Sequence, residues 1–191
     1  MGLSGDGFSV IDFETTGFAA RKADRVVEIG VVCVHHSGEV VEEWTTLVNP
    51  ERDVSAGYVH GITARDVYGA PRFEEVAGLL ADSLRGRILV AHNLSFEAQF
   101  LMAEFGRLGH DLELDRGSGI CTMTLASTYI PHSPRNLQAC CDCRAYAFQT
   151  ARGFVIVRIE DKTENDLGFN ATLRAITTTV GHGPKEGARY E

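Results

Sequence analysis

The sequence lacks any apolar run close to the roughly 20 residues that a membrane-spanning helix needs. Its first residues also lack a basic stretch followed by an apolar segment, the pattern of a secretory signal. Positive charge is scarce, because 18 Lys and Arg against 26 Asp and Glu give a formal net charge of -8. We therefore expect a cytoplasmic protein without membrane association, and one that does not hold nucleic acid by covering phosphates with basic side chains.

Cysteine is too sparse and too unevenly placed to form a disulfide framework. Five cysteines are present, and three of them lie together as Cys140, Cys141 and Cys143. An odd number in one tight group fits reduced thiols in a cytosolic protein better than a set of disulfides. The group also lacks the two paired chelating turns of a zinc motif, so buried free thiols are favoured.

Residues 1–143 carry strand and helix patterns that predict one α/β domain. The chain has 191 residues, 44% of them hydrophobic, which is enough for a single core. Apolar and β-branched runs predict strands at residues 8–13, 26–34, 40–48 and 88–91, the second and third joined as an antiparallel hairpin. A hairpin that leads into a mixed sheet with helices packed on it is an α/β arrangement.

Helical spacing of apolar residues predicts helices between and after these strands. Pro71 suits the first turn of one helix, and Ser95 is expected to cap the next. A short helix is expected over residues 121–129, and another from Leu137 with Asn136 as its cap. Residues 144–191 differ in character and are treated as a divergent tail.

The tail offers few structural signals. Residues 153–160 (GFVIVRIE) are expected to form a lone strand, and no sustained period follows them. Thr177–Thr179 and the glycines after them are expected to be loop or disorder.

Two acids at the end of the first strand are the strongest chemical signal. Asp12 and Glu14 lie two residues apart, so side-chain alternation places both carboxylates on the same face. Two such acids could simply face solvent, but the apolar run around them makes their burial costly unless they serve a metal ion. Gly17 follows and would allow a tight turn close to a substrate.

A second polar group follows the fourth predicted strand. His92 and Asn93 come directly after it, and Glu97 lies near the start of the next helix. Taken alone, Glu97 could merely favour the helix dipole, and the His-Asn pair could merely form the turn.

These segments together resemble the DEDDh-type 3′→5′ exonucleases of the ribonuclease H-like fold, the family of the epsilon proofreading subunit of bacterial DNA polymerase III. Residues 12–17 (DFETTG) resemble the first motif of the family, and residues 90–101 (VAHNLSFEAQFL) resemble the second. The run 59–63 (VHGIT) resembles the segment that links them. The resemblance covers roughly the first three quarters of the chain.

The resemblance implies a ribonuclease H-like mixed sheet and a two-metal site for Mg²⁺ or Mn²⁺. Asp12, Glu14 and Glu97 would be the catalytic metal ligands, although Glu97 stands where the family usually has aspartate. Thr15 and Thr16 would lie against the terminal nucleotide, and His92 and Asn93 would shape the rim near the scissile phosphate. The implied partners are DNA 3′ ends, with RNA as a second possibility, and a DNA polymerase subunit in replication or repair.

The third motif of the family is missing from the sequence. It supplies a histidine as general base and, five residues later, an aspartate that binds metal, downstream of the helix near Leu137. The only histidine after Leu137 is His182, and Gly187 stands five residues beyond it. His110 and Asp115 have the right spacing but lie before Cys121, where no such role is expected.

Three functional hypotheses therefore stay open from the sequence. The first is a metal-dependent exonuclease impaired by the loss of the third motif. The second is a non-catalytic pseudo-exonuclease that binds nucleic-acid ends or a polymerase. The third is a fragment that does not fold, because a helix that should cover the sheet is absent.

Overall fold

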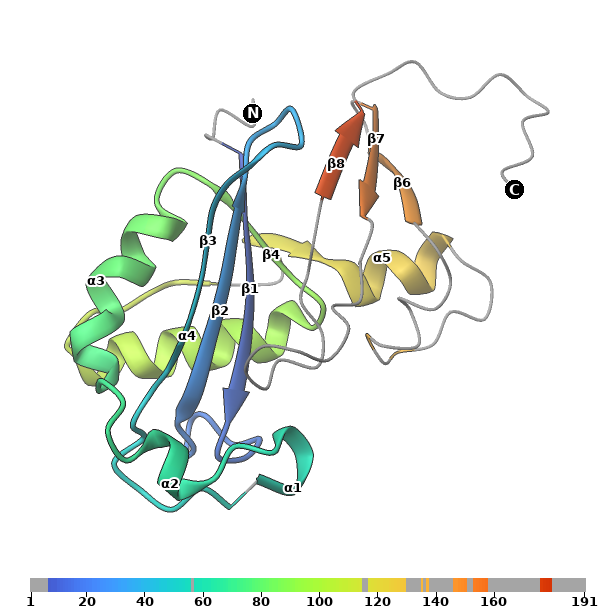
Figure 1. Cartoon of the computed structure of the whole chain (residues 1–191). Helices are drawn as coiled ribbons and strands as arrows, with labels where there is room; N and C mark the ends of the chain where they lie inside the picture. Colours follow the sequence, from blue (N-terminus) through green and yellow to red (C-terminus); the bar gives the residue numbers. More distant parts are fainter. Residues whose placement is uncertain are drawn as a thin grey trace.

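The computed structural model describes residues 7–55, 57–114, 117–129, 135, 137, 146–150, 153–157 and 176–179 (Figure 1). The helix expected from Leu137 and the boundary expected at residue 143 fall almost wholly outside this part of the chain. Within the part that is described, no helix is long and apolar enough to cross a membrane.

A five-stranded mixed sheet forms the centre of the protein (Figure 1). Its strands lie in the order β3-β2-β1-β4-β5. Their bounds are β1 Phe8–Thr15, β2 Val26–Val34, β3 Val40–Leu47, β4 Ile88–Ala91 and β5 Gly119–Cys121. The first three strands pair antiparallel, whereas β4 runs parallel to both β1 and β5. The predicted strands, hairpin and mixed sheet are confirmed, and β5 is an addition too short for its pattern to be read.

Five helices connect and cover these strands in the described part of the chain. They are α1 Gly57–His60, α2 Ala64–Val67, α3 Phe73–Leu84, α4 Leu94–Arg107 and α5 Thr122–Tyr129. The helices α1 and α2 have four residues each, which is too few to show a helical period. The expected helix over residues 121–129 is confirmed as α5, except that Cys121 ends β5.

The starts of α3 and α4 differ from the sequence-based expectation. Arg72, not Pro71, is the residue before α3, and its N–H donates to the Glu75 carboxylate at 2.7 Å. Asn93, not Ser95, occupies the N-cap of α4, because its carbonyl oxygen accepts the N–H groups of Phe96 and Glu97. Each helix therefore begins at the residue whose backbone groups make the first hydrogen bonds with the helix.

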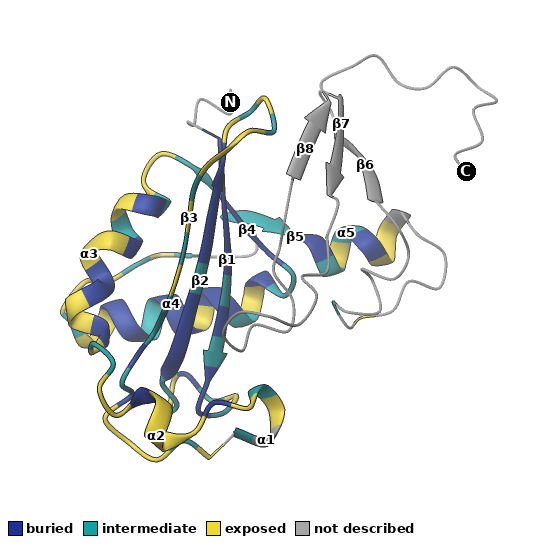
Figure 2. Cartoon of the chain, in the orientation of Figure 1, coloured by how far each residue is buried: buried dark blue, intermediate teal, exposed yellow. Residues whose placement is uncertain are grey.

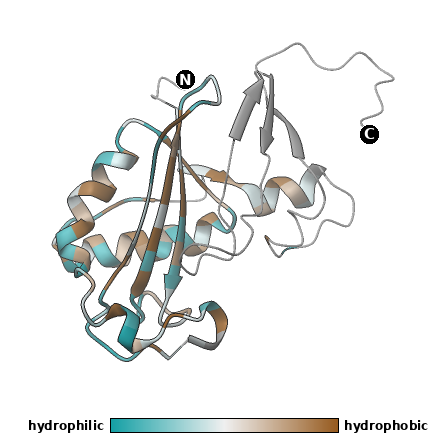
Figure 3. Cartoon of the chain, in the orientation of Figure 1, coloured by the Kyte–Doolittle hydropathy of each residue, from teal (hydrophilic) through white to brown (hydrophobic). Residues whose placement is uncertain are grey.

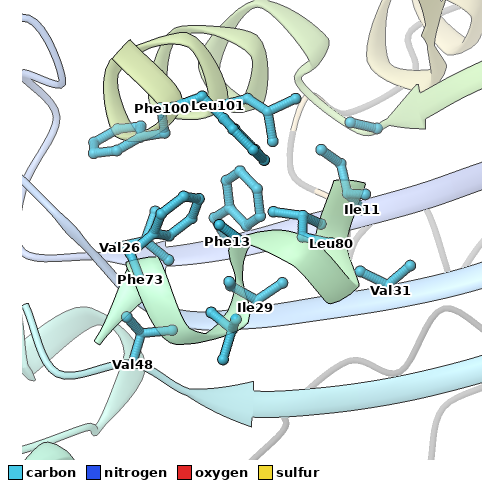
Figure 4. Close-up of a cluster of buried hydrophobic side chains, with 14 of the residues drawn as sticks. Ile11, Phe13, Val26, Ile29, Val31, Val48, Phe73, Leu80, Phe100 and Leu101 are labelled. Atoms are coloured by element: carbon cyan, nitrogen blue, oxygen red, sulfur yellow. The ribbon is translucent and has the colours of Figure 1, made fainter. Parts of the chain in front are cut away.

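The main core lies between one face of the sheet and the helices α3 and α4. Figure 4 shows Ile11 and Phe13 of β1 and Ile29 of β2 directed toward the cluster that includes Leu80 of α3 and Phe100 of α4. The central strands are buried and largely hydrophobic along their length (Figures 2 and 3), with hydrophilic residues toward the end of β1. The helices α3 and α4 therefore cover one face of these strands.

Alternation along β1 and β2 sends the remaining residues to the opposite face. Phe8 and Val10 of β1 pair with Val34 and Val32 of β2, and these four form part of a second buried apolar cluster. The next residues of β1 on this face are Asp12 and Glu14. The fold thus changes from apolar to acidic along one face as β1 approaches its end.

The tail contains a second sheet. Strands β6 Tyr146–Thr150, β7 Gly153–Val157 and β8 Ile176–Thr179 pair antiparallel in the order β6-β7-β8. The strand expected within residues 153–160 is confirmed as β7, but it is not alone, because it pairs with β6 and β8. The loop or disorder expected at Thr177–Thr179 is wrong, because these residues belong to β8. Pairing with β7, a segment elsewhere in the chain, decides that Ile176–Thr179 is a strand, and local sequence preference does not reveal this pairing.

Candidate active site

The end of β1 has no strand paired with it on one side, because β4 is short. Pairing between these parallel strands covers only Phe8–Val10 of β1 and Ile88–Val90 of β4. From Asp12 onward, β1 pairs with β2 alone. The β4-facing edge of this segment is therefore open to residues of α4, the helix that follows β4.

Glu97 fills that opening from the first turn of α4. Its side chain is buried, with 4% exposure, and its carboxylate accepts a hydrogen bond from the backbone N–H of Phe13. Its Oε2 atom has no hydrogen-bond partner in the part of the chain that the structure describes. The carboxylate interacts electrostatically with both Asp12 and Glu14. Two motifs separated by about 80 residues of sequence are thus brought together at one strand end.

The surroundings of Asp12, Glu14 and Glu97 disfavour the charged form of each carboxylate. Burial raises the pKa of Asp12. Burial, followed by repulsion from Asp12, raises the pKa of Glu14 to about 7. Burial and both neighbouring acids raise the pKa of Glu97 well above its ordinary value. None of the ion pairs formed by the described residues includes any of the three. Burial and mutual repulsion therefore disfavour the charged forms of all three acids, and no basic side chain among the described residues offsets this.

Glu28 of β2 is a fourth acid of this group, and the sequence-based prediction missed it. It lies directly opposite Glu14 in the antiparallel pair and is 9% exposed. Burial, then repulsion from Glu14 and Asp12, raises its pKa to about 7. The signal available in the sequence was an acid within the apolar run VVEIG, which is costly to bury without a partner.

The donor set suits a hard divalent cation. Carboxylate oxygens are the ligands that Mg²⁺ and Mn²⁺ prefer. Glu97 Oε2, which has no hydrogen-bond partner among the described residues, is an oxygen of this kind. Among the described residues, however, no three His, Cys, Asp or Glu side chains lie close enough together to hold one ion. The assignment of Asp12, Glu14 and Glu97 as metal ligands thus stays a prediction.

The loop after β1 is organised by Thr15 and Thr16, both of which are buried. The Thr15 hydroxyl donates to the Gly17 carbonyl at 2.7 Å, and the Thr16 hydroxyl donates to Asp24 Oδ1 at 3.1 Å. A Cβ on Gly17 would lie 2.5 Å from Asp24 Oδ2, so glycine is needed here for space. The ring of His60, in α1, accepts the Ile62 N–H at Nδ1, which leaves Nε2 to donate to the Thr15 carbonyl at 3.2 Å.

His92 and Asn93 lie between β4 and α4, as their positions in the sequence predicted. The two ring nitrogens of His92 are engaged, Nδ1 with the Thr122 hydroxyl at 3.1 Å and Nε2 with the Arg135 carbonyl at 2.9 Å. Burial lowers the pKa of His92 more than the bond to Arg135 raises it. Asn93 Oδ1 accepts the Ser95 hydroxyl at 3.1 Å. Contacts of Thr15, Thr16, His92 and Asn93 with a substrate remain predictions.

Residues 9–149 match the exonuclease family of the RNase T type, which covers well over half of the chain. The chain belongs to this exonuclease family. Among curated relatives, the DNA polymerase III subunit epsilon of Rickettsia conorii (strain ATCC VR-613 / Malish 7) is 31% identical over 136 residues, covering 69% of this chain and 59% of the relative. The same subunit of Treponema pallidum (strain Nichols) is 35% identical over 99 residues, covering 51% and 45%. This exonuclease-family chain spans about half the length of these two relatives.

Solved exonuclease structures share the fold. Exonuclease X in complex with 5′ overhanging duplex DNA has a TM-score of 0.56 and 29% identity, covering 71% of this chain and 72% of that chain. The nuclease domain of 3′hExo, a DEDDh family member bound to rAMP, has a TM-score of 0.57 and 20% identity, covering 71% and 77%, and supports the fold alone. The predicted ribonuclease H-like α/β fold and the family resemblance are confirmed.

Proposed function

We propose that this chain is a metal-dependent 3′→5′ exonuclease that acts on nucleic-acid 3′ ends, with DNA as the preferred substrate. The observation that carries the proposal is the group of buried and half-buried carboxylates at the end of β1, which has no basic partner among the described residues and leaves Glu97 Oε2 unpartnered. Membership of the exonuclease family supports the proposal. So does 33% identity over 107 residues to the "3'-5' exonuclease DinG" of Bacillus subtilis (strain 168).

Asp12, Glu14 and Glu97 are the residues that would hold the cations. Bound Mg²⁺ or Mn²⁺ ions would activate a water molecule and stabilise the leaving 3′ oxygen. The buried end of β1 restricts the access of bulk water, which strengthens electrostatic interactions there. The loop of Thr15 and Thr16 would lie against the terminal nucleotide, and His92 and Asn93 would border the scissile phosphate.

The likeness to epsilon subunits extends the proposal to partners. We infer that the protein works in the cytoplasm beside a DNA polymerase subunit in replication or repair. Its substrate would be a single-stranded or frayed DNA 3′ end, with an RNA end as the alternative. Because the net charge is -8, binding should depend less on salt concentration than in a protein with a basic groove.

A non-catalytic, end-binding protein is the second candidate, and the state of the histidines favours it. The family motif with a general-base histidine is missing from the sequence after Leu137. Of the histidines near the acids that the structure describes, His60 and His92 have both ring nitrogens engaged. Loss of a general base alone costs on the order of 10²–10⁴ in rate. An active enzyme would therefore be slow.

A nuclease assay separates the two candidates. The purified chain is incubated with a 5′-labelled single-stranded DNA and Mn²⁺, beside Asp12→Asn, the exposed-surface control Glu39→Gln and an EDTA sample. We expect stepwise shortening by the parent and by the control but not by Asp12→Asn or with EDTA. Equal shortening by the parent and Asp12→Asn would exclude this site as the nuclease. Metal-dependent binding of the labelled strand without any shortening would establish the non-catalytic alternative.

A further inference from the structure

We propose that Arg21 and Lys22, at the tip of the loop between β1 and β2, bind the phosphate backbone of the single strand whose 3′ end enters the site. This inference rests on the proposed function, because it concerns the substrate of the same site. It assigns a contact with the strand outside the acidic group, and this contact needs no bound metal ion.

The loop forms a turn that projects Arg21 and Lys22 into solvent. The Lys22 N–H donates to the Ala19 carbonyl at 2.9 Å, and the Asp24 N–H donates to the same carbonyl at 3.4 Å. Residues 20–23 therefore lie in a turn that closes at Ala19, and the side chains of Arg21 and Lys22 are both exposed. The turn thus holds two basic side chains on the outside of the protein.

The loop leaves the sheet at the end of β1 that carries the acidic group. Thr15 is the last residue of β1, and β2 begins at Val26. The Thr16 N–H donates to the Arg25 carbonyl at 2.9 Å, so the two ends of the loop are joined directly beside this strand end. Figure 1 shows the loop at the same end of the sheet as α1 and α2. A nucleic-acid strand held at the acidic group therefore has this loop as one of its neighbours.

Two arginines from other parts of the chain hold the backbone of the loop. Arg107 of α4 donates to the carbonyls of Ala20 at 3.1 Å and Asp24 at 3.3 Å. Arg52 donates to the Ala23 carbonyl and to the Asp24 carboxylate. The conformation of the loop is therefore set before a strand arrives, so binding would require little further ordering of its backbone.

The positive charges of Arg21 and Lys22 are not neutralised by any acid in the part of the chain that the structure describes. Neither side chain belongs to an ion pair formed by the described residues. By contrast, the arginines around the loop are each paired with an acid, namely Arg25 and Arg107 with Glu104, and Arg52 with Asp24. In a chain with a net charge of -8, the tip is a local positive site that suits phosphate groups.

An exposed aromatic ring at the start of the loop favours a nucleic-acid strand over an acidic protein as the occupant. Phe18 is 74% exposed, and the centre of its ring lies 6.3 Å from that of Phe96 in α4. Proteins that bind single strands combine basic side chains along the backbone with aromatic rings on which bases stack. The loop presents both kinds of group between residues 18 and 22.

The test is binding of a fluorescently labelled oligothymidylate by the full chain, measured by fluorescence anisotropy in EDTA, which prevents metal-dependent cleavage. The double variant Arg21→Gln/Lys22→Gln removes both charges. We expect weaker binding and a salt dependence, the slope of log K against log of the salt concentration, that is shallower by about 1.4, because each phosphate contact on a single strand contributes about 0.7. The ratio of the parent and variant affinities should therefore shrink about 7-fold between about 50 and 200 mM salt.

Two controls separate a local contact from a change in net charge. The exchange variant Arg21→Lys/Lys22→Arg keeps both charges and should bind with the slope of the parent. Arg85→Gln removes one exposed charge, as each single variant Arg21→Gln or Lys22→Gln does, and should leave the slope unchanged. Arg85 lies just before β4, whose Ile88 pairs with Phe8 at the opposite end of β1 from the loop.

Each result decides for or against the assignment of Arg21 and Lys22. A slope in the double variant equal to that of the parent, or an equal reduction by Arg85→Gln, would overturn it. Tighter binding of polyglutamate than of oligothymidylate would also overturn it, in favour of an acidic protein partner. If the parent binds no strand in EDTA, the assignment fails as well. Shortening of the labelled strand by the parent with Mn²⁺ would leave the proposed function standing in each of these cases.

Discussion

Without divalent cations, the folded protein should lose stability as the pH rises, because of Glu14 and Glu28. Each has its pKa raised from 4.5 to about 7, so between these values the folded chain binds more protons than the unfolded chain. The stabilisation associated with these two groups is therefore fully present below pH 4.5 and is lost as the pH rises through about 7. This is the opposite of the usual behaviour of paired carboxylates.

The magnitude follows from the same values. Raising the pKa of a fully buried group from 4.5 to about 7 corresponds to about 3.4 kcal/mol. Glu14 is only half-buried, and the two carboxylates share one mutual repulsion, so solvent screening and coupling reduce the effect to roughly 1–2 kcal/mol for the pair. His92 acts in the opposite direction, because its pKa is lowered by burial and it favours folding as the pH rises.

A comparison of variants isolates the effect of the acids from that of His92. The free energy of unfolding is measured by urea titration at pH 5 and pH 8 in EDTA for the parent and for Glu14→Gln. We expect the parent to lose about 1 kcal/mol more than the variant between the two pH values. Mn²⁺ should reduce the loss in the parent, because a bound cation replaces protons. An identical pH dependence in the parent and the variant would refute this account of the charge cluster.

Two further predictions concern packing, and both are checked by urea unfolding at one pH. Gly17→Ala should destabilise the fold by about 1–3 kcal/mol, because the added Cβ would lie 2.5 Å from Asp24 Oδ2. In its control, Gly106→Ala in α4, the added Cβ meets nothing within 4 Å, so this variant should be more stable by about 0.5–1 kcal/mol. Equal changes in the free energy of unfolding of the two variants would contradict this reasoning. Leu80→Ala, at 0% exposure, should cost about 2–5 kcal/mol, and its exposed neighbour Leu79→Ala should change stability by no more than about 0.5 kcal/mol. A large loss at Leu79 would show that the outer face of α3 is covered.

Local signals in the sequence were strong where a strand or helix is long and carries its own pattern. The apolar runs at β1 and β2 and the spacing of Asp12 and Glu14 were sufficient to predict both strands and two acids on one face. Short or non-local elements were not predictable in this way. The four-residue helices α1 and α2 have no period, and β8 is a strand through its pairing with β7.

The sequence by itself determined the fold class, the family and three of the acids at the candidate site, because each is encoded in a contiguous motif. The tertiary structure alone decided that Glu28 joins them, since strand register is a relation between two segments and not a property of either one. The tertiary structure also determines that Glu97 contacts β1. The pairing of β4 with β1 ends at Val90, so the Phe13 N–H is available to the Glu97 carboxylate from α4.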